Sequence, residues 1–269
     1  MSASQGLSVA VVQMEVVPGA VERNRRRALE LAREALEAHP DVILFPEEML
    51  VGYAPNLQEL AEAQDGPTTQ SLQRMLAGTE THVLWGLTER QGERCYIAAT
   101  LMNAHGVVAN YRKTHLWWAA EGLRHEPTFY APGNELVTFD LRGHRCGVMI
   151  CYDGDFPEMT RSYANLGCRV LFWLNNRESR GHAEVRPLAV GNSMIIASAC
   201  CCGKDETGRH CEGGSNITDH DGALLAELWD REGILRAVVH PEQVPEARRR
   251  NPWHHGRRPE LYVHEPAKV

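Results

Sequence analysis

Residues 145–157 read R-C-G-V-M-I-C-Y-D-G-D-F-P, an apolar strand that ends abruptly at a cysteine. The run Arg145–Ile150 is short and contains β-branched residues, as fully buried strands do. Gly154 can adopt a positive φ and Pro157 suits the first turn of a helix, so we expect a strand-to-helix corner here. A cysteine at such a corner lies near backbone N–H groups and the positive end of a helix, which favour the thiolate. Cys151 is therefore a candidate nucleophile, and the alternative is a buried structural cysteine.

Composition sets the class of protein. Of 269 residues, 43% are hydrophobic and 23% charged, which excludes a disordered or fibrous chain. The net charge of −7 gives no electrostatic reason to expect nucleic acid. No secretory signal is visible, and the longest apolar run, residues 194–202, is far short of the ~20 residues that cross a bilayer. The chain contains eight cysteines and no C-x-x-C pair, so we expect a cytoplasmic protein with free thiols, no metal site and no membrane partner.

Hydrophobic patterning predicts buried strands that alternate with helices in the first third of the chain and again after Cys151, with strand pairs between. Expected strands are 7–13, 42–45, 83–89, 95–102, 107–111, 136–140, 145–150, 170–174, 193–201, 215–218, 224–227 and 234–240; expected helices are 21–38, 68–76, 158–166 and 183–192. No repeat or linker divides the chain. We expect residues 1–269 to form one α/β domain with more than one sheet and outer helices, with 241–269 as an extended C-terminal tail.

Three polar residues follow the ends of apolar strands. Glu47 comes after residues 42–45, Lys113 after 107–111, and Cys151 directly after 145–150. Ligands of α/β proteins bind at the carboxyl ends of strands, so these three groups are candidates for one pocket. A carboxylate can take the thiol proton, an ammonium can stabilise an oxyanion and a thiolate can attack a carbonyl. Taken singly, Glu47 is equally explained as a first-turn helix acid and Lys113 as a solvated charge.

The segments F-P-E-E (45–48), Y-R-K-T-H-L-W (111–117) and I-C-Y-D-G-D-F-P-E (150–158) resemble the three signature regions of the nitrilase superfamily of carbon–nitrogen hydrolases. G-G-S-N-I (213–217) and R-R-P-E-L-Y (257–262) add to a match that covers nearly the whole chain. The resemblance implies a four-layer α-β-β-α sandwich, assembled as a homodimer or a higher homo-oligomer. It also implies that no cofactor is needed.

The resemblance also implies a role for each catalytic residue. Glu47 is the expected general base, Lys113 the oxyanion stabiliser and Cys151 the nucleophile. Glu121, eight residues after Lys113, is similar to the second glutamate of amidase members, which orients the substrate amide and the attacking water. The expected reaction is hydrolysis of a small primary amide to an acid and ammonia through a thioester, with the backbone N–H of Tyr152 as a second oxyanion donor.

The residues around the nucleophile bear on the substrate. Cys151-Tyr152-Asp153 resembles amidase members, whereas nitrilases of the superfamily usually read C-W-E. Asp155 stands where omega-amidases and carbamoyl-amino-acid hydrolases often have an arginine, and an acid there would repel a carboxylate. This favours neutral or cationic amides, unless Asp155 only caps the next helix. Further candidates for substrate contacts are Trp117, Trp173 and Asn175; the tryptophans are equally compatible with a place in the core.

Other functions remain open from sequence alone. The same three residues serve nitrilases and N-carbamoyl amide hydrolases, and a binding or assembly module could keep the fold without the reaction. Transfer of the acyl group to an amine is another outcome of a thioester. A papain-like pair of Cys151 with His115 is a further alternative.

Overall fold

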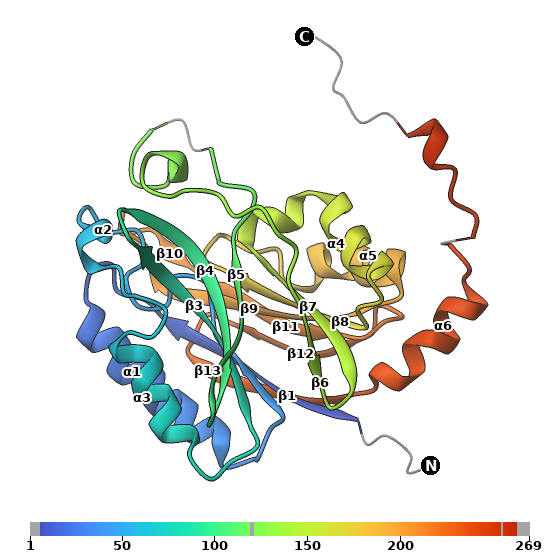
Figure 1. Cartoon of the computed structure of the whole chain (residues 1–269), viewed down its shortest axis with the longest axis horizontal. Coiled ribbons are helices and arrows are strands. Elements are labelled where there is room, and N and C mark those ends of the chain that lie inside the picture. The colour runs from blue at the N-terminus through green and yellow to red at the C-terminus, as the bar shows by residue number, and fades with distance from the viewer. Residues whose placement is uncertain (1–5, 119–120, 254, 263–269) are drawn as a thin grey trace.

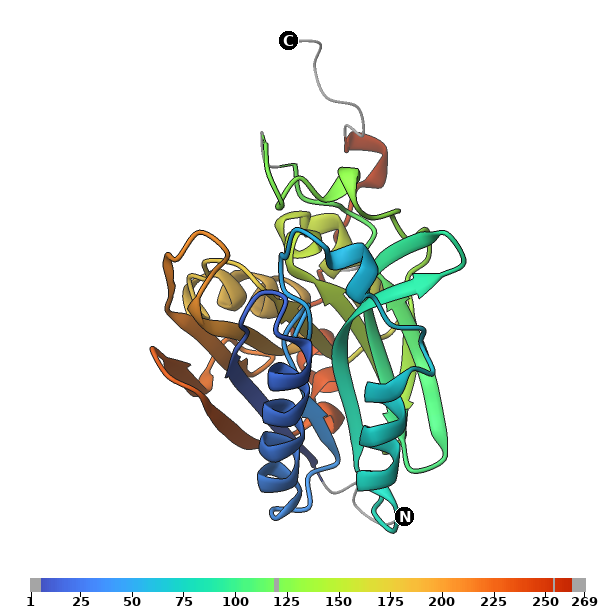
Figure 2. The ribbon, with the colours of Figure 1, turned by 90° about the vertical axis from the view of Figure 1, so that its left-hand side faces the viewer.

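Two β-sheets pack face to face and carry helices on their outer surfaces (Figures 1 and 2). The structure, a computed structural model, describes residues 6–118, 121–253 and 255–262. Helices α1 (Val21–Leu36) and α3 (Pro67–Leu76) cover one sheet, and α4 (Pro157–Asn165) and α5 (His182–Asn192) cover the other. The expected α-β-β-α sandwich is confirmed.

The first sheet has the strand order β5-β4-β3-β2-β1-β13. Its strands are β1 (Leu7–Glu15), β2 (Val42–Leu44), β3 (His82–Gln91), β4 (Arg94–Asn103), β5 (Gly106–Arg112) and β13 (Gly233–Val239). β1, β2 and β3 are parallel, and β3, β4 and β5 form an antiparallel meander. A short helix, α2 (Leu57–Leu60), lies between β2 and α3.

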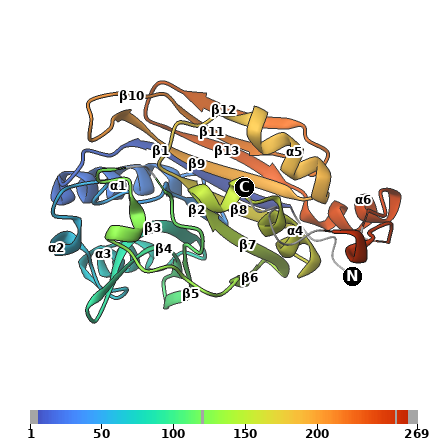
Figure 3. The same ribbon diagram turned by 90° about the horizontal axis from the view of Figure 1, so that it is seen from above.

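The second sheet has the order β6-β7-β8-β9-β11-β12. Its strands are β6 (Thr138–Leu141), β7 (His144–Ile150), β8 (Val170–Asn175), β9 (Ile195–Lys204), β11 (Gly213–Thr218) and β12 (Leu224–Trp229), with β10 (His210–Cys211) paired to β9. The two sheets meet where the end of β1 runs parallel to β9, at Met14 opposite Cys201 (Figure 3).

Strand direction explains how distant segments reach one site. β7, β8 and β9 are parallel, β9 is parallel to β1, and β1 is parallel to β2. β5 reverses twice from β3 and therefore runs in the same direction as β2. The carboxyl ends of β2, β5, β7 and β8 consequently lie at the same edge of the sandwich.

Burial follows the apolar pattern of the sequence. Every residue of β2 and β8 is buried, as expected for strands covered on both faces. Helix α1 buries Ala28, Leu31, Ala32 and Ala35 on the face that the 3.6-residue period predicts. Most predicted elements are found with ends shifted by a few residues. The segment predicted as an extended tail contains a 3-10 turn, η3 (Pro241–Gln243), the short helix α6 (Val244–Arg250) and a second 3-10 turn, η4 (Pro259–Leu261).

Among the described residues, no helix has both the length and the apolar character that a bilayer crossing requires.

Candidate active site

The strand-to-helix corner places Cys151 at the end of β7. A 3-10 turn, η2 (Cys151–Asp155), follows the strand, and Pro157 begins α4 as predicted. The prediction that Gly154 takes a positive φ is wrong: Cys151 itself has φ +45°, a strained value for a residue with a side chain. Gly154 is needed for another reason, because a Cβ there would lie 2.2 Å from the Trp173 ring.

Lys113 follows β5 and is fully buried. Its Nζ lies 2.9 Å from Oε1 of Glu47 and 2.8 Å from Oε1 of Glu126, and both carboxyl groups are also fully buried. One ammonium therefore bridges two carboxylates below the surface of the protein. Burial lowers the pKa of Lys113, but the electrostatic effects of its neighbours Cys151, Glu47 and Glu126 outweigh this and raise that pKa well above the ordinary value.

Glu47 connects the ends of three strands. It follows β2, its Oε1 accepts from Lys113 after β5, and its Oε2 accepts from the backbone N–H of Asn176, 2.8 Å away after β8. The chain before it passes tightly over β3, since a Cβ at Gly86 would lie 2.3 Å from the Pro46 carbonyl oxygen. This geometry brings Glu47 and Lys113 together as predicted.

The structure brings Glu126 to Lys113, and not Glu121, the residue predicted as the second glutamate. Glu121 is exposed, whereas Glu126 accepts hydrogen bonds from the Tyr53 hydroxyl at 2.6 Å and the Trp117 N–H at 2.7 Å as well as from Lys113. The chain loops outward after Trp117 and returns, because the N–H of Glu126 donates to the Trp117 carbonyl at 3.1 Å. That return moves the buried acid from eight to thirteen residues after Lys113, and spacing alone could not show it.

Asp153 joins the lysine segment to the cysteine corner. Its buried carboxylate accepts from the Tyr111 hydroxyl (2.7 Å), the Thr114 hydroxyl (3.0 Å), the His115 N–H (3.0 Å) and the Ile150 N–H (2.9 Å). The His115 ring also contacts Asp153, 3.0 Å from Nδ1 to Oδ1. His115 is thus engaged with the carboxylate, which argues against the alternative Cys–His pair.

The surroundings of Cys151 favour its thiol form, whereas the sequence predicts a stabilised thiolate. Burial raises the pKa of Cys151, the neighbouring Glu47 raises it further, and the positive charges of Lys113 and Arg177 only partly oppose this. A buried thiol needs an adjacent base before it can act as a nucleophile. Burial also raises the pKa of Glu47 above its ordinary value, which makes that carboxylate a stronger base.

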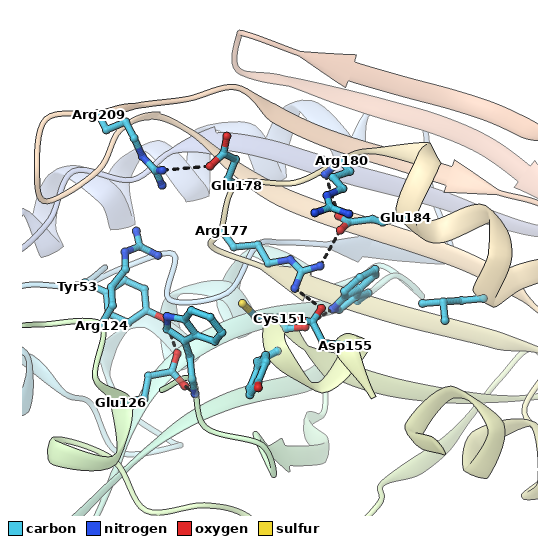
Figure 4. Close-up of a pocket in the computed structure, with 15 residues that line it drawn as sticks. Tyr53, Arg124, Glu126, Cys151, Asp155, Arg177, Glu178, Arg180, Glu184 and Arg209 are labelled. Atoms are coloured by element: carbon cyan, nitrogen blue, oxygen red, sulfur yellow. Dashed lines mark hydrogen bonds and ion pairs between the residues drawn. The ribbon is translucent and has the colours of Figure 1, made fainter. Parts of the chain in front are cut away.

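A cavity of about 560 Å³ opens over Cys151 (Figure 4). Its apolar and aromatic lining consists of Tyr53, Trp117, Tyr152, Trp173 and Leu188, and its charged lining of Arg124, Glu126, Asp155, Arg177, Glu178, Arg180, Glu184 and Arg209. The cavity lining therefore includes four of the five predicted substrate contacts.

Asn175 is the predicted contact that does not line the cavity. It is fully buried at the end of β8, and its amide donates to the Ser198 hydroxyl at 3.1 Å. Its side chain supports the second sheet behind the site.

The far wall of the cavity is a chain of ion pairs that sequence reasoning missed. Arg177 donates to Asp155 at 2.6 Å and to Glu184 at 2.7 Å, and its guanidinium lies 5.0 Å from the centre of the Trp173 ring. Figure 4 shows Arg177 between the two carboxylates and beside Cys151. The charge of Asp155 is therefore compensated, and the argument that it repels carboxylate substrates loses its basis. No local pattern in the sequence pairs residues 155, 177 and 184.

Arg124 closes the other side of the cavity. It forms a bidentate pair with Glu206, with distances of 2.6 and 3.0 Å, and donates to the Asn176 carbonyl at 2.9 Å. Its guanidinium lies 4.4 Å from the centre of the Tyr53 ring. These contacts fix the loop that carries Glu126 against the turn that follows β9.

Comparisons with known proteins agree with this geometry. The family model described as carbon-nitrogen hydrolase matches residues 8–249. A protein of Pseudomonas protegens named "Hydrolase in pqqF 5'region" is 32% identical over 97% of this chain and 93% of its own length. An (R)-stereoselective amidase of a Pseudomonas species is 30% identical over 90% of this chain and 88% of its own. The solved structure of XC1258 from Xanthomonas campestris, a CN-hydrolase superfamily protein, shares the fold with a TM-score of 0.86 at 21% identity, covering 97% of this chain and 99% of that one.

Proposed function

The chain belongs to the carbon–nitrogen hydrolase family, and from that premise we propose that it is an amidase that hydrolyses a small primary amide through a thioester on Cys151. The observation that carries the proposal is the buried cluster of Lys113 with Glu47 and Glu126 beside that cysteine. A relative 30% identical to this chain is named an amidase, which supports the choice of amides.

The first half-reaction forms the thioester. Glu47 takes the proton from the Cys151 sulfur as the sulfur bonds to the amide carbon. Lys113 and the backbone N–H of Tyr152 stabilise the negative charge that develops on the carbonyl oxygen. The C–N bond then breaks as Glu47 returns the proton to nitrogen, so that ammonia leaves and a thioester remains.

The second half-reaction reuses the same base. Glu47 takes a proton from water, the resulting hydroxide attacks the thioester carbon, and the C–S bond breaks as the sulfur regains the proton. Glu126 keeps Lys113 in place through its 2.8 Å contact and has one edge at the cavity, where it can accept from the substrate amide. The acid product then leaves the cavity.

The lining of the cavity bears on the acyl group of the proposed substrate. Aromatic side chains line it near Cys151, and compensated charges line its far end, so we expect an acyl group with an apolar part next to the carbonyl. We also propose that the protein works as a homodimer or larger homo-oligomer, which light scattering measures. The unbridged cysteines support a reducing compartment such as the cytoplasm.

Intact-mass spectrometry during turnover tests the reaction. We expect a mass increase equal to the acyl group at Cys151 with simple primary amides, together with release of ammonia, and neither signal with Cys151→Ala. Nitriles and N-carbamoyl compounds in the same panel test the alternative substrates. If primary amides, nitriles and N-carbamoyl compounds all failed to acylate Cys151, the proposed reaction would be wrong. The remaining function would then be that of a binding module with the same fold.

A further inference from the structure

Glu48 is another buried glutamate, next to the proposed base Glu47 in the chain, and it has no part in the reaction described above. Glu48 is fully buried and has φ +53°, the left-handed region that residues with side chains rarely adopt. The Thr88 hydroxyl on β3 donates to its Oε2. Its Oε1 is buried and has no hydrogen-bond partner among the residues that the structure describes. A strained backbone and a poorly solvated acid are costly, so a functional reason is worth seeking.

Glu47 and Glu48 are adjacent in the chain but have opposite environments. The two oxygens of Glu47 accept from an ammonium at 2.9 Å and from a backbone N–H at 2.8 Å, which stabilise a carboxylate. Glu48 has a neutral hydroxyl donor instead, and burial raises its pKa to about 8. When two neighbouring acids have such different surroundings, the one without an ammonium or backbone N–H donor is the one that keeps its proton, and here that is Glu48, whose neighbours are the Thr88 and Tyr130 hydroxyls.

The groups that face Glu48 offer it no cation of its own. Thr88 and Cys95 approach from β3 and β4, and Tyr130 and Glu126 from the loop after β5. Lys113 is the positive charge that acts on it, and that ammonium already contacts both Glu47 and Glu126. An anionic Glu48 would therefore put three carboxylates around one ammonium.

We propose that Glu48 is a positioning residue, held as a neutral carboxylic acid so that Glu47 is the anionic base and Lys113 keeps its charge for the oxyanion. Loss of the Glu48 proton then sets the alkaline limit of the reaction. The kinetic test of this inference rests on the proposed function, because it measures amide hydrolysis. The protonation state of Glu48 can be measured whether or not the protein is an amidase. The thiolate and the oxyanion both carry negative charge, so a third carboxylate in the cluster disfavours each of them.

The kinetic test compares wild type with Glu48→Gln, which keeps a neutral side chain of nearly the same shape. We expect the wild-type kcat to fall about tenfold from pH 7 to pH 9, because a group of pKa about 8 is mostly protonated at the first pH and mostly ionised at the second. Glu48→Gln should keep kcat at pH 7 within about threefold and lose this alkaline fall. The exposed Glu59→Gln should behave as wild type.

Either of two results overturns the proposal: the same alkaline fall in wild type and Glu48→Gln, or loss of activity at pH 7 in a folded Glu48→Gln. The second result would mean that the acid proton itself takes part in the chemistry. If Glu48→Gln does not fold, infrared spectroscopy of wild type decides, since a protonated-carboxyl band must disappear with a midpoint near pH 8. Absence of that band at pH 7 refutes the neutral state.

A third readout separates this inference from the proposed function. If wild type hydrolyses no amide, the rate at which iodoacetamide alkylates Cys151 is measured in place of kcat. Mass spectrometry measures this rate at pH values from 7 to 9. We expect the rate to rise less steeply in wild type than in Glu48→Gln, because an ionised Glu48 opposes the thiolate. Equal slopes would overturn the coupling, whereas absent turnover with unequal slopes would overturn only the substrate class.

Discussion

The floor and the far wall of the cavity are built in different ways. On the floor, Lys113, Glu47 and Glu126 are fully buried; Glu47 and Lys113 directly follow strands, so their positions depend on sheet geometry, and Glu126 is brought to them by the loop after β5. In the wall, Arg177 and Asp155 are partly exposed, with 19% and 42% of their side-chain surface accessible, and they belong to turns. The floor is therefore suited to fixed chemistry, whereas the wall can change without moving the buried residues of the floor, although Arg177 also acts on the pKa of Cys151.

Removal of the floor cation should have the largest effect. Lys113→Ala takes away one oxyanion donor, worth about 3–4 kcal/mol of barrier, and kcat should fall by about three orders of magnitude. It also leaves two buried carboxylates without a counter-charge, so the melting temperature should fall as well. Ammonia release and calorimetry measure the two effects. A folded variant with wild-type kcat would show that Lys113 is not the oxyanion stabiliser.

The two candidate acids of the lysine loop offer a matched pair of substitutions. Glu126→Gln weakens the hold on Lys113 and should lower kcat about a hundredfold, whereas Glu121→Gln, at an exposed position, should stay within twofold of wild type. Initial rates of amide hydrolysis at saturating substrate compare them. The reverse order of effects would restore Glu121 as the second glutamate.

Substitutions in the wall should alter preference more than rate. Arg177→Met leaves Asp155 and Glu184 uncompensated, so kcat/KM for a cationic amide should rise about fivefold relative to a neutral one of the same size. Asp155→Asn should shift the preference by a smaller amount in the opposite direction. A preference that does not respond to Arg177→Met would mean that substrates do not reach this wall.

The same contrast explains which features sequence reasoning could recover. Cys151, Lys113 and Glu47 follow apolar strands, and the period-two and continuous apolar patterns locate strand ends well. Glu126 was not predicted because the chain returns to Trp117 through backbone pairing, with Trp118 opposite His125, and such a return leaves no mark in residue spacing. The surroundings that favour the thiol of Cys151 were not predicted for another reason, since the helix-end argument considered nearby dipoles but not burial.

The wall was missed because its partners are side chains from separate turns. Asp155 was predicted to line the cavity, and it does, but its effect on substrates depends on Arg177, twenty-two residues away. Charged residues are common at surfaces, so their pairing is decided by the tertiary fold. The local sequence can therefore predict where such a charged group lies, but it cannot predict which opposite charge pairs with it.

The join between β1 and β9 has a consequence for how this protein responds to distant mutations. Glu47 and Lys113 follow strands of the first sheet, and Cys151 follows a strand of the second. The distance between the proposed base and the nucleophile therefore depends on the spacing of the two sheets. An overfilled interior would move the reacting groups apart and a hollowed one would let them approach, while every one of them remained intact. In this molecule, core residues between the two sheets therefore influence the reaction rate although they do not contact a substrate.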